Sequence, residues 1–317
     1  YEIIDTKMFK YVADTLVQES GLVPVLHCST VDVIMEGNKI KGVITESKSG
    51  RQAILAKRVI DATGDADIAH FCGAPYRLDP KDTLEPVSVN FGCSGVDVQT
   101  FLDYIINRQT SIADWGQESG EKEAKEFSTF LVEPFTKAKE NGEIPEYAHL
   151  ASYWNDFTDA GEVRSLNAIH MPGYDCTDVQ DLTKAEIEGR KHVMWAIKAL
   201  KKYTPGFDKA RLRTIGASLG TRESRKILGA YNLTKHDVLN EARFKDSIGI
   251  NPEFLDGNNT AIMPSTGRYF HVPYGIILPQ KVENLLVAGR CVAGDKITHA
   301  ATRQMMCCTV TGQGAGV

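Results

Sequence analysis

Apolar and polar residues alternate in blocks that divide the chain into an N-terminal α/β part, a longer middle part and a C-terminal return to buried strands. The first block places apolar residues at helical spacing after a predicted N-cap at Asp5 or Thr6, and Gly21 sits where a glycine ends a helix. Strand-like blocks separated by turn signals follow. The predicted strands cover Val23–Cys28, Thr30–Met35, Ile40–Thr45, Ala53–Ala56 and Arg58–Ala62.

The shorter strands are expected to form a small antiparallel meander attached to a parallel sheet, because glycine-containing turns separate them. The strand Arg58–Ala62 is of the buried type and ends at Thr63-Gly64-Asp65, which leads into a predicted helix over Ala66–Cys72. Two interpretations of this turn stay open. It is either a ligand contact, since glycine lets the backbone approach a cofactor, or a turn whose Thr and Asp cap the helix.

The middle part, from about Tyr76 to Tyr269, has more charge, more aromatic residues and longer helices, as expected for an inserted domain. The predicted strands are Val87–Cys93, Val163–Met171 and Arg211–Leu219. The predicted helices are Asp97–Arg108, Glu121–Asn141 with an interruption near Pro134, one from a cap at Asp181 to Tyr203, and one that begins near Thr221 after Gly220. Arg268–Leu278 returns the chain to the first domain.

The C-terminal block contains the apolar run Leu285–Ala288, which has the length and branching of a buried strand and stops at Gly289-Arg290. A helix-compatible pattern with Gly312, Gly314 and Gly316 comes next. A strand that ends in glycine and feeds a glycine-rich helix start presents free N–H groups to phosphates or to an anionic ring.

Three ordered motifs carry a resemblance to a known family: VIDATGDADIAHFCGAP at Val59–Pro75, GTRESRKILGAYNLTKHDV at Gly220–Val238, and NLLVAGRC followed by HAATRQMMCCTVTGQGAGV. Together they resemble FAD-dependent oxidoreductases in the fumarate reductase-like branch of the glutathione reductase superfamily. The resemblance implies an α/β fold with an FAD-binding Rossmann-like domain of ββα three-layer type. It places this domain at residues 1–75 and 270–317, with an α+β substrate domain inserted at 76–269.

The resemblance also implies FAD as the cofactor, with the Gly289 turn beside the ribityl chain and the next helix pointing its N-terminus at the pyrimidine end of the flavin. Asp295 is a candidate for a ribityl hydroxyl. The residues that the resemblance assigns to the cofactor are Val31, Ala62, Thr63, Gly64, Gly289, Arg290, Asp295, Gly312, Gln313, Gly314 and Ala315.

Two catalytic candidates follow from the same resemblance. The family segment His-Gly-Ala-Asn-Arg corresponds to His299-Ala300-Ala301-Thr302-Arg303, and its arginine holds a substrate carboxylate over the flavin. An Arg fork fixes a carboxylate through two charge-assisted bonds. His299 is then either a proton acceptor or donor, or a hydrogen-bonding support. The sequence departs from the family pattern at Gln304–Met306, so the identity of the substrate does not transfer.

Arg222, His271 and Tyr274 are candidates for substrate binding. Arg222 and Arg225 would share a face of the helix expected near Thr221, where cations oppose the helix dipole by about 0.3–1 kcal/mol. The compensating anion is either Glu223 or a substrate carboxylate or FAD phosphate. For His271 and Tyr274 the alternative is ordinary packing or hydrogen bonding.

The family begins with a strand and a GxGxxG turn that holds the FAD pyrophosphate, and the start of this sequence has neither. We therefore expect the FAD domain to be N-terminally incomplete. The predicted function is transfer of a hydride between a small polar or anionic substrate and flavin N5, with an unknown electron acceptor. The alternative is a non-catalytic or split flavoprotein fragment that needs another segment or chain to bind FAD.

Composition bears on which partners and which cellular location the protein has. The 317 residues carry a net charge of −5 without a basic block, which argues against a nucleic-acid partner and for a small-molecule substrate. No apolar run approaches the roughly 18 residues that span a bilayer. Seven cysteines without regular pairing indicate reduced thiols and a cytoplasmic location, and Cys307-Cys308 is either a redox pair or packing. No metal site is expected, and a homo-oligomer or complementing chain is left open.

Overall fold

The computed structural model describes residues 5–106, 132–151, 157–158, 160–252, 255–257, 260–262 and 267–317. The first element, α1 (Thr6–Glu19), is confirmed as predicted: the Asp5 carboxylate accepts hydrogen bonds from Lys7 N at 2.9 Å and Met8 N at 3.2 Å. No α1 side chain is buried. The strand expected at Val23–Cys28 is wrong, because its residues are largely exposed and Pro24 has no N–H to donate to a ladder.

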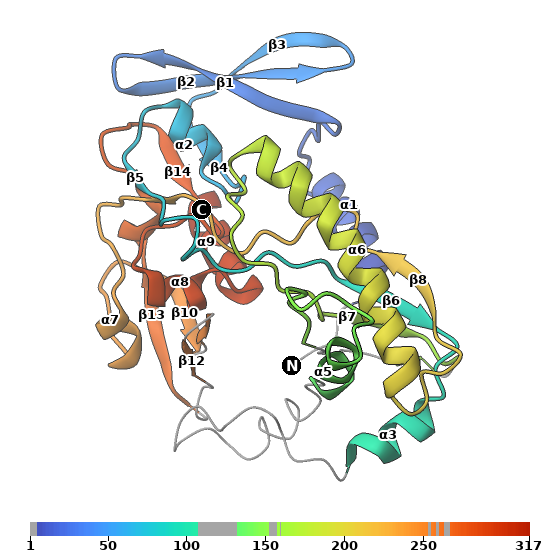
Figure 1. The fold of residues 1–317 in the computed structure, drawn as a ribbon. Helices are drawn as coiled ribbons and strands as arrows, with labels where there is room; N and C mark the ends of the chain where they lie inside the picture. Colours follow the sequence, from blue (N-terminus) through green and yellow to red (C-terminus); the bar gives the residue numbers. More distant parts are fainter. Residues whose placement is uncertain are drawn as a thin grey trace.

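The expected meander is confirmed. It consists of β1 (Cys28–Glu36), β2 (Lys39–Ser47) and β3 (Gly50–Leu55), which pair antiparallel in that order. A register shift between Thr30 and Asp32 leaves Val31 outside the pairing. Figure 1 shows the meander in blue at the top of the view, above α2 and the β4–β14 pair.

The two buried strands expected at the ends of the chain lie side by side. In the structure they are β4 (Val59–Asp61) and β14 (Leu285–Val287), and they pair parallel in register. The short helix α2 (Asp67–Phe71) follows β4, and α8 (Lys296–Thr302) and α9 (Met305–Gly316) follow β14. Parallel pairing brings the carboxyl ends of both strands to the same edge, where turns and helix starts meet.

A second antiparallel sheet forms in the middle part. Its central strand β6 (Phe91–Ser94) pairs with β7 (Val163–Leu166) and β8 (Arg211–Ile215), all shorter than the predicted strands. The helices of this part are α3 (Val98–Ile106), α5 (Glu133–Glu140) and α6 (Val179–Tyr203). The portions of the predicted helices at residues 107–108 and 121–131 lie outside the described residues.

The cap of α6 lies earlier than predicted. Asp178 caps the helix by accepting from Gln180 N at 2.7 Å, whereas the Asp181 carboxylate accepts from Asp175 N and pairs with Lys81 at 2.5 Å. Figure 1 shows α6 running diagonally beside the β6–β8 sheet.

The chain returns through a series of short elements. These are β5 (Tyr76–Arg77) paired with β9 (Lys226–Ile227), α7 (Lys235–Leu239), β10 (Ser247–Pro252) paired with β13 (Tyr269–Pro273), β11 (Leu255–Gly257) paired with β12 (Thr260–Ile262), and the 3₁₀ turn η2 (Tyr274–Ile277). The helix predicted near Thr221 is wrong: residues 221–225 form an irregular segment that leads into β9.

Buried apolar residues form two separate cores. One contains residues between Val87 and Leu219, and the other joins residues from Ile40–Ala74 to residues from Ile227–Ala315. The division into domains at 75 and 269 stays a prediction, and we propose that the second boundary lies nearer to 226, where membership of the core changes. Among the described residues, no helix has the length and apolarity to cross a membrane.

Candidate functional site

The turns that follow β4 and β14 meet at the carboxyl edge of the strand pair. Ala288 N donates to Asp61 O at 2.9 Å, and Arg290 Nη1 lies 3.2 Å from Asp65 Oδ1. Both turns need a glycine, since Gly64 has φ +82° and Gly289 has φ +90°. A Cβ on Gly64 would lie 2.6 Å from Arg290 Nη2. The segments that the sequence assigned to one cofactor are therefore in contact.

A buried carboxylate, which sequence reasoning missed, holds the first turn. Asp61 accepts hydrogen bonds from Thr63 N at 3.1 Å, Thr63 Oγ1 at 2.7 Å and Ala69 N at 2.9 Å. Thr63 Oγ1 in turn accepts from Asp67 N at 3.1 Å, as the capping interpretation of this turn expected. The Asp65 carboxylate does not cap the helix, because it bonds Ser224 and Arg290. Ala62 and Thr63 are exposed at the edge.

The space beside the second turn is open. A Cβ on Gly289 or on Gly312 would meet no atom within 4 Å, and Gly289 N donates to Thr311 Oγ1 at 3.0 Å, which places α9 beside the turn. The expectation that Gly312–Gly316 begin the helix is wrong, because α9 begins at Met305. Gln304, its N-cap, makes no side-chain cap bond, so the first-turn N–H groups have no side-chain partner there.

The glycines near the end of α9 serve packing as well. A Cβ on Gly314 would lie 2.6 Å from Ile248 Cδ1, so glycine allows α9 to pack closely on β10. On the same helix Gln313 is exposed and Ala315 is buried. A role for these residues in cofactor binding stays a prediction.

The segment Thr221–Lys226 lies across the Thr63–Asp65 turn instead of forming a helix. Ser224 Oγ donates to Asp65 Oδ1 at 2.6 Å, and Arg225 Nη1 donates to Asp65 O at 3.2 Å and lies 2.8 Å from Asp67 Oδ1. The prediction that Arg222 and Arg225 share one face of a helix is therefore wrong. Tertiary contacts with the turn outweigh the weak helix propensity of this stretch.

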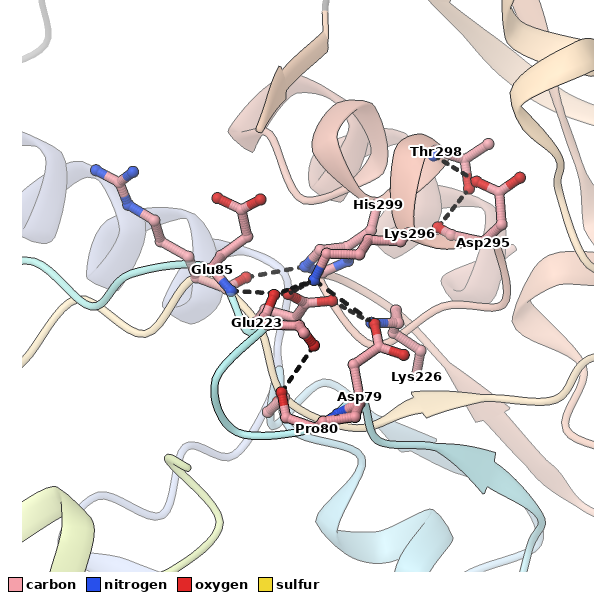
Figure 2. Close-up of polar contacts among 12 residues, drawn as sticks. Asp79, Pro80, Glu85, Glu223, Lys226, Asp295, Lys296, Thr298 and His299 are labelled. Carbon is pink, nitrogen blue, oxygen red and sulfur yellow. Dashed lines mark hydrogen bonds and ion pairs between the residues drawn. The ribbon is translucent and has the colours of Figure 1, made fainter. Parts of the chain in front are cut away.

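A buried ion-pair network fixes the other end of this segment (Figure 2). The Lys226 and Glu223 side chains are 1% and 0% exposed and pair with each other; Lys226 Nζ also lies 3.2 Å from Asp79 Oδ2. Lys296 Nζ, from α8, lies 2.9 Å from Glu223 Oε2, which also accepts from Glu85 N at 2.8 Å. Glu223 is thus paired with lysines and not with Arg222 or Arg225. No local sequence spacing signals this network, since its members come from three separate segments.

Two guanidinium groups, Arg222 and Arg303, lie close enough to interact. Burial lowers the pKa of Arg222, the charge of Arg303 lowers it further, and Asp256 and Glu85 oppose the shift. Arg303 donates to Asp256 O and lies 3.3 Å from Asp256 Oδ2, while its Nε is buried without a partner among the described residues. Among the described residues, none forms a hydrogen bond or ion pair with the Arg222 guanidinium.

His170 is a member of this cluster that sequence reasoning missed. Burial lowers the pKa of His170 to about 4, and the charge of Arg222 contributes, whereas Asp256 opposes the shift. We therefore define the arginine cluster as Arg222, Arg303, Asp256 and His170. It contains two permanent cations, one carboxylate and an imidazole that is neutral at pH 7.

His299 lies behind the arginine cluster and is 2% exposed. Its Nε2 lies 3.0 Å from Arg222 O; because a carbonyl only accepts, Nε2 carries the proton and donates. Burial holds the pKa of His299 well below its usual value, and the charges of Lys226, Arg303 and Arg290 add to the effect. Nδ1 has no partner among the described residues. The imidazole is therefore neutral and supports the backbone of Arg222.

The remaining candidates have other contacts. His271 Nδ1 lies 3.1 Å from Phe244 N, and Tyr274 N donates to Asp246 O at 2.9 Å, so both belong to the packing around β13. The Asp295 carboxylate caps α8 through Thr298 N at 2.8 Å and also accepts from Lys235 N at 2.7 Å. In the part of the chain that the structure describes, none of these three has a hydrogen bond or ion pair with the arginine cluster, and their roles at the site stay predictions.

The adjacent cysteines of α9 are not activated thiols. Cys307 is buried, which raises the pKa of its thiol to about 12, and burial also raises the pKa of Cys308. All seven cysteines are free. These environments favour the packing interpretation of Cys307-Cys308. Within the described ranges, no group of three or more His, Cys, Asp or Glu side chains has the arrangement of a metal site.

Several solved structures are similar to the chain at low identity. A geranylgeranyl bacteriochlorophyll reductase-like protein from Thermoplasma acidophilum is 11% identical with a TM-score of 0.40, over 70% of this chain and 42% of that one. A triple mutant of a flavin-dependent brominase is 16% identical with a TM-score of 0.36, over 67% of this chain and 42% of that one. An Aspergillus oryzae formate oxidase variant is 9% identical with a TM-score of 0.32, over 94% of this chain and 61% of that one. The chain thus spans less than two thirds of the length of each.

Comparison with protein families gives a match over nearly the whole sequence. No curated protein matches the chain. The model of the family described as FAD dependent oxidoreductase matches residues 2–317, which include both strand-end turns, the ion-pair network and the arginine cluster. The chain therefore belongs to the FAD-dependent oxidoreductase family, and its cofactor is FAD.

Proposed function

We propose that this oxidoreductase transfers a hydride between a small anionic substrate, held by the arginine cluster, and FAD held at the carboxyl edge of β4 and β14. The observation that carries the proposal is the contact between the Thr63–Asp65 turn and the Gly289-Arg290 turn. The family match supports an oxidoreductase and gives no support to a non-catalytic fragment. A Rossmann-like FAD domain is part of this proposal.

The residues at the edge fit a flat, anionic cofactor. Gly289 and Gly312 border open space, so a planar ring system would approach backbone there without a clash from a side chain. Arg290 supplies a cation that pairs with Asp65. Its side chain remains 23% exposed. We assign Thr63, Gly64, Gly289 and Arg290 to the cofactor, with the α9 N-terminus at Met305 as a further source of N–H donors.

The arginine cluster suits a carboxylate. Arg222 and Arg303 repel each other, whereas Asp256 and Glu85 act on Arg222 in the opposite sense and Asp256 pairs with Arg303. A substrate carboxylate would relieve this repulsion and give Arg303 Nε its missing acceptor. Each hydrogen bond to a charged group contributes roughly 1.5–3 kcal/mol. Two such bonds would fix both the position and the angle of a small acid.

His299 is better suited to positioning than to proton transfer. Its Nε2 proton is committed to Arg222 O, and its low pKa keeps Nδ1 unprotonated at neutral pH. We therefore assign His299 the role of holding the Arg222 backbone. When bound, flavin supplies the two-electron chemistry. The chain supplies the orientation of the substrate, and the terminal electron acceptor remains to be identified.

The test compares Arg222→Met and Arg303→Met with Arg213→Met, a control that removes an exposed arginine paired with Glu162. The visible absorbance of the purified proteins gives the FAD content. The change in that absorbance during titration with small mono- and dicarboxylates gives their dissociation constants. We expect retained FAD and a roughly tenfold or larger loss of carboxylate affinity in the first two variants, and no loss in the control.

The outcomes separate the two parts of the proposal. If both cluster variants bind carboxylates as the wild type does, the substrate site is wrong and the FAD assignment stands. A folded wild-type protein that stays colourless after incubation with FAD would instead contradict the assignment of the cofactor edge.

A further inference from the structure

A cavity in the middle part of the chain lies outside the region assigned to FAD and substrate. It has a volume of about 330 Å³, at the lower end of the range of small-molecule pockets. Its walls come from α6, from the segment around Tyr147, and from the segment after His170; the lining residues are Tyr147, His149, Met171, Pro172, Tyr174, Glu188 and His192. None of them belongs to the arginine cluster. The cavity combines aromatic rings with one carboxylate and two imidazoles.

His192 lines this cavity with a neutral ring. The side chain is 2% exposed, and Nδ1 lies 3.0 Å from Glu188 O. A carbonyl only accepts, so Nδ1 carries the proton, and Nε2 is left as a bare acceptor. Nε2 has no partner in the described part of the chain. This nitrogen is buried and does not reach the cavity, so His192 contributes its neutral ring to the cavity wall.

Glu188 adds a charged acceptor on the same side. Its Oε1 lies 3.4 Å from Tyr147 Oη and 3.6 Å from His192 Nδ1, and its Oε2 pairs with Lys191 Nζ at 3.1 Å. Lys191 is exposed, so this ion pair is screened and weak. Glu188 therefore brings to the cavity a negative charge that is only weakly neutralised by an exposed lysine.

Aromatic rings complete the surroundings of the Glu188 carboxylate. Tyr147 packs edge-on against Trp195 with ring centroids 5.9 Å apart, and the His192 ring lies 4.8 Å from that of Trp195. Tyr174 lines the cavity as well. Aromatic faces attract cations, and a carboxylate beside them adds a charge-assisted bond. An aromatic and partly anionic cavity therefore favours a ligand that carries positive charge.

We propose that this cavity binds a small organic cation, with a primary ammonium group bound by Glu188 beside the rings of Tyr147 and Tyr174. The site is additional to the proposed hydride-transfer site. The imidazoles do not oppose a cation: burial lowers the pKa of His192, and burial together with the charge of Lys139 lowers the pKa of His149. Both rings are therefore neutral at pH 7 and do not repel a cation.

The test titrates the FAD-loaded full chain with benzylammonium and with benzyl alcohol, which has nearly the same shape without the charge. Isothermal titration calorimetry gives the affinities. We expect saturable binding of benzylammonium and binding of the alcohol that is at least tenfold weaker. Glu188→Gln should weaken ammonium binding by at least tenfold, while Lys191→Gln, which frees Glu188 Oε2, should strengthen it.

Two further variants locate the binding. Glu146→Gln removes the same charge next to Tyr147 without altering a lining residue, and it should leave the affinity unchanged. Benzylammonium should change the tryptophan emission of the wild type but not of Trp195→Phe. Equal affinity for the alcohol, an unchanged affinity in Glu188→Gln, or no saturable binding by the folded wild type would each overturn the proposal.

Discussion

Replacement of Lys226 by Met tests how the buried ion-pair network holds the segment that carries Arg222. Lys226 and Lys296 balance Glu223 and Asp79, so the network is neutral as a whole (Figure 2). Met has a similar length and no charge. The variant leaves Glu223, whose side chain is 0% exposed, with Lys296 and the Glu85 N–H as its remaining partners.

The expected loss follows from burial. Removing one partner of a buried pair costs roughly 3–5 kcal/mol, because the other charge remains without full compensation. Lys296 retains part of that compensation, so we expect a loss near 3 kcal/mol in the free energy of unfolding. Adding Glu223→Gln to the variant restores neutrality, and the double variant should be less destabilised than the sum of the single variants by about 1–3 kcal/mol.

Urea denaturation of the FAD-loaded proteins provides the measurement, with Lys41→Met as the matched control. Lys41 pairs with Glu36 at 3.0 Å, but these side chains are 48% and 72% exposed. An exposed pair contributes about 0–1 kcal/mol. A loss in Lys226→Met no larger than in Lys41→Met, or strict additivity with Glu223→Gln, would refute the reasoning.

Two further predictions address the cofactor edge and the arginine cluster. Gly289→Ala should lower the free energy of unfolding by about 1–2 kcal/mol and also lower the FAD content per chain. Gly50, which has a similar φ of +93° in open space, is the control, and Gly50→Ala should lower stability alone. Equal loss of FAD in both variants would contradict the prediction. Because the pKa of His170 is about 4 in the folded chain, the unfolded chain binds a proton first as the pH falls below about 6.5. Stability should therefore fall by up to about 3 kcal/mol between pH 6.5 and 4, and less in His170→Gln, as urea denaturation against pH will show.

Local signals in the sequence sufficed to predict those elements whose structure depends on neighbouring residues along the chain. The Asp5 cap and helical spacing predicted α1, and the turn residues predicted the meander. The short apolar runs typical of buried strands predicted β4 and β14, and the parallel pairing of these strands brings their turns together. The family match over residues 2–317 supports the cofactor that the motifs indicated.

Distant partners explain what the sequence did not reveal. The break at Gly220 predicted a helix start near Thr221, but Ser224 bonds Asp65 and Glu223 bonds lysines on β9 and α8. Likewise, the glycine spacing in α9 resembles a phosphate-binding turn, although Gly314 makes room for Ile248. Such contacts leave no periodic pattern, so only three-dimensional packing discloses them.

The pairing of β4 with β14 sets an order for biosynthesis. Arg58 Nη1 donates to Asn284 Oδ1 at 3.2 Å across 226 residues of sequence, so β4 leaves the ribosome long before its partner exists. The core between Val87 and Leu219 has its contacts within one continuous stretch and can condense while translation continues. If FAD binds at the β4–β14 edge as proposed, its capture is a late event in maturation. Chains that stall before Leu285 would display a folded middle part with no coloured cofactor.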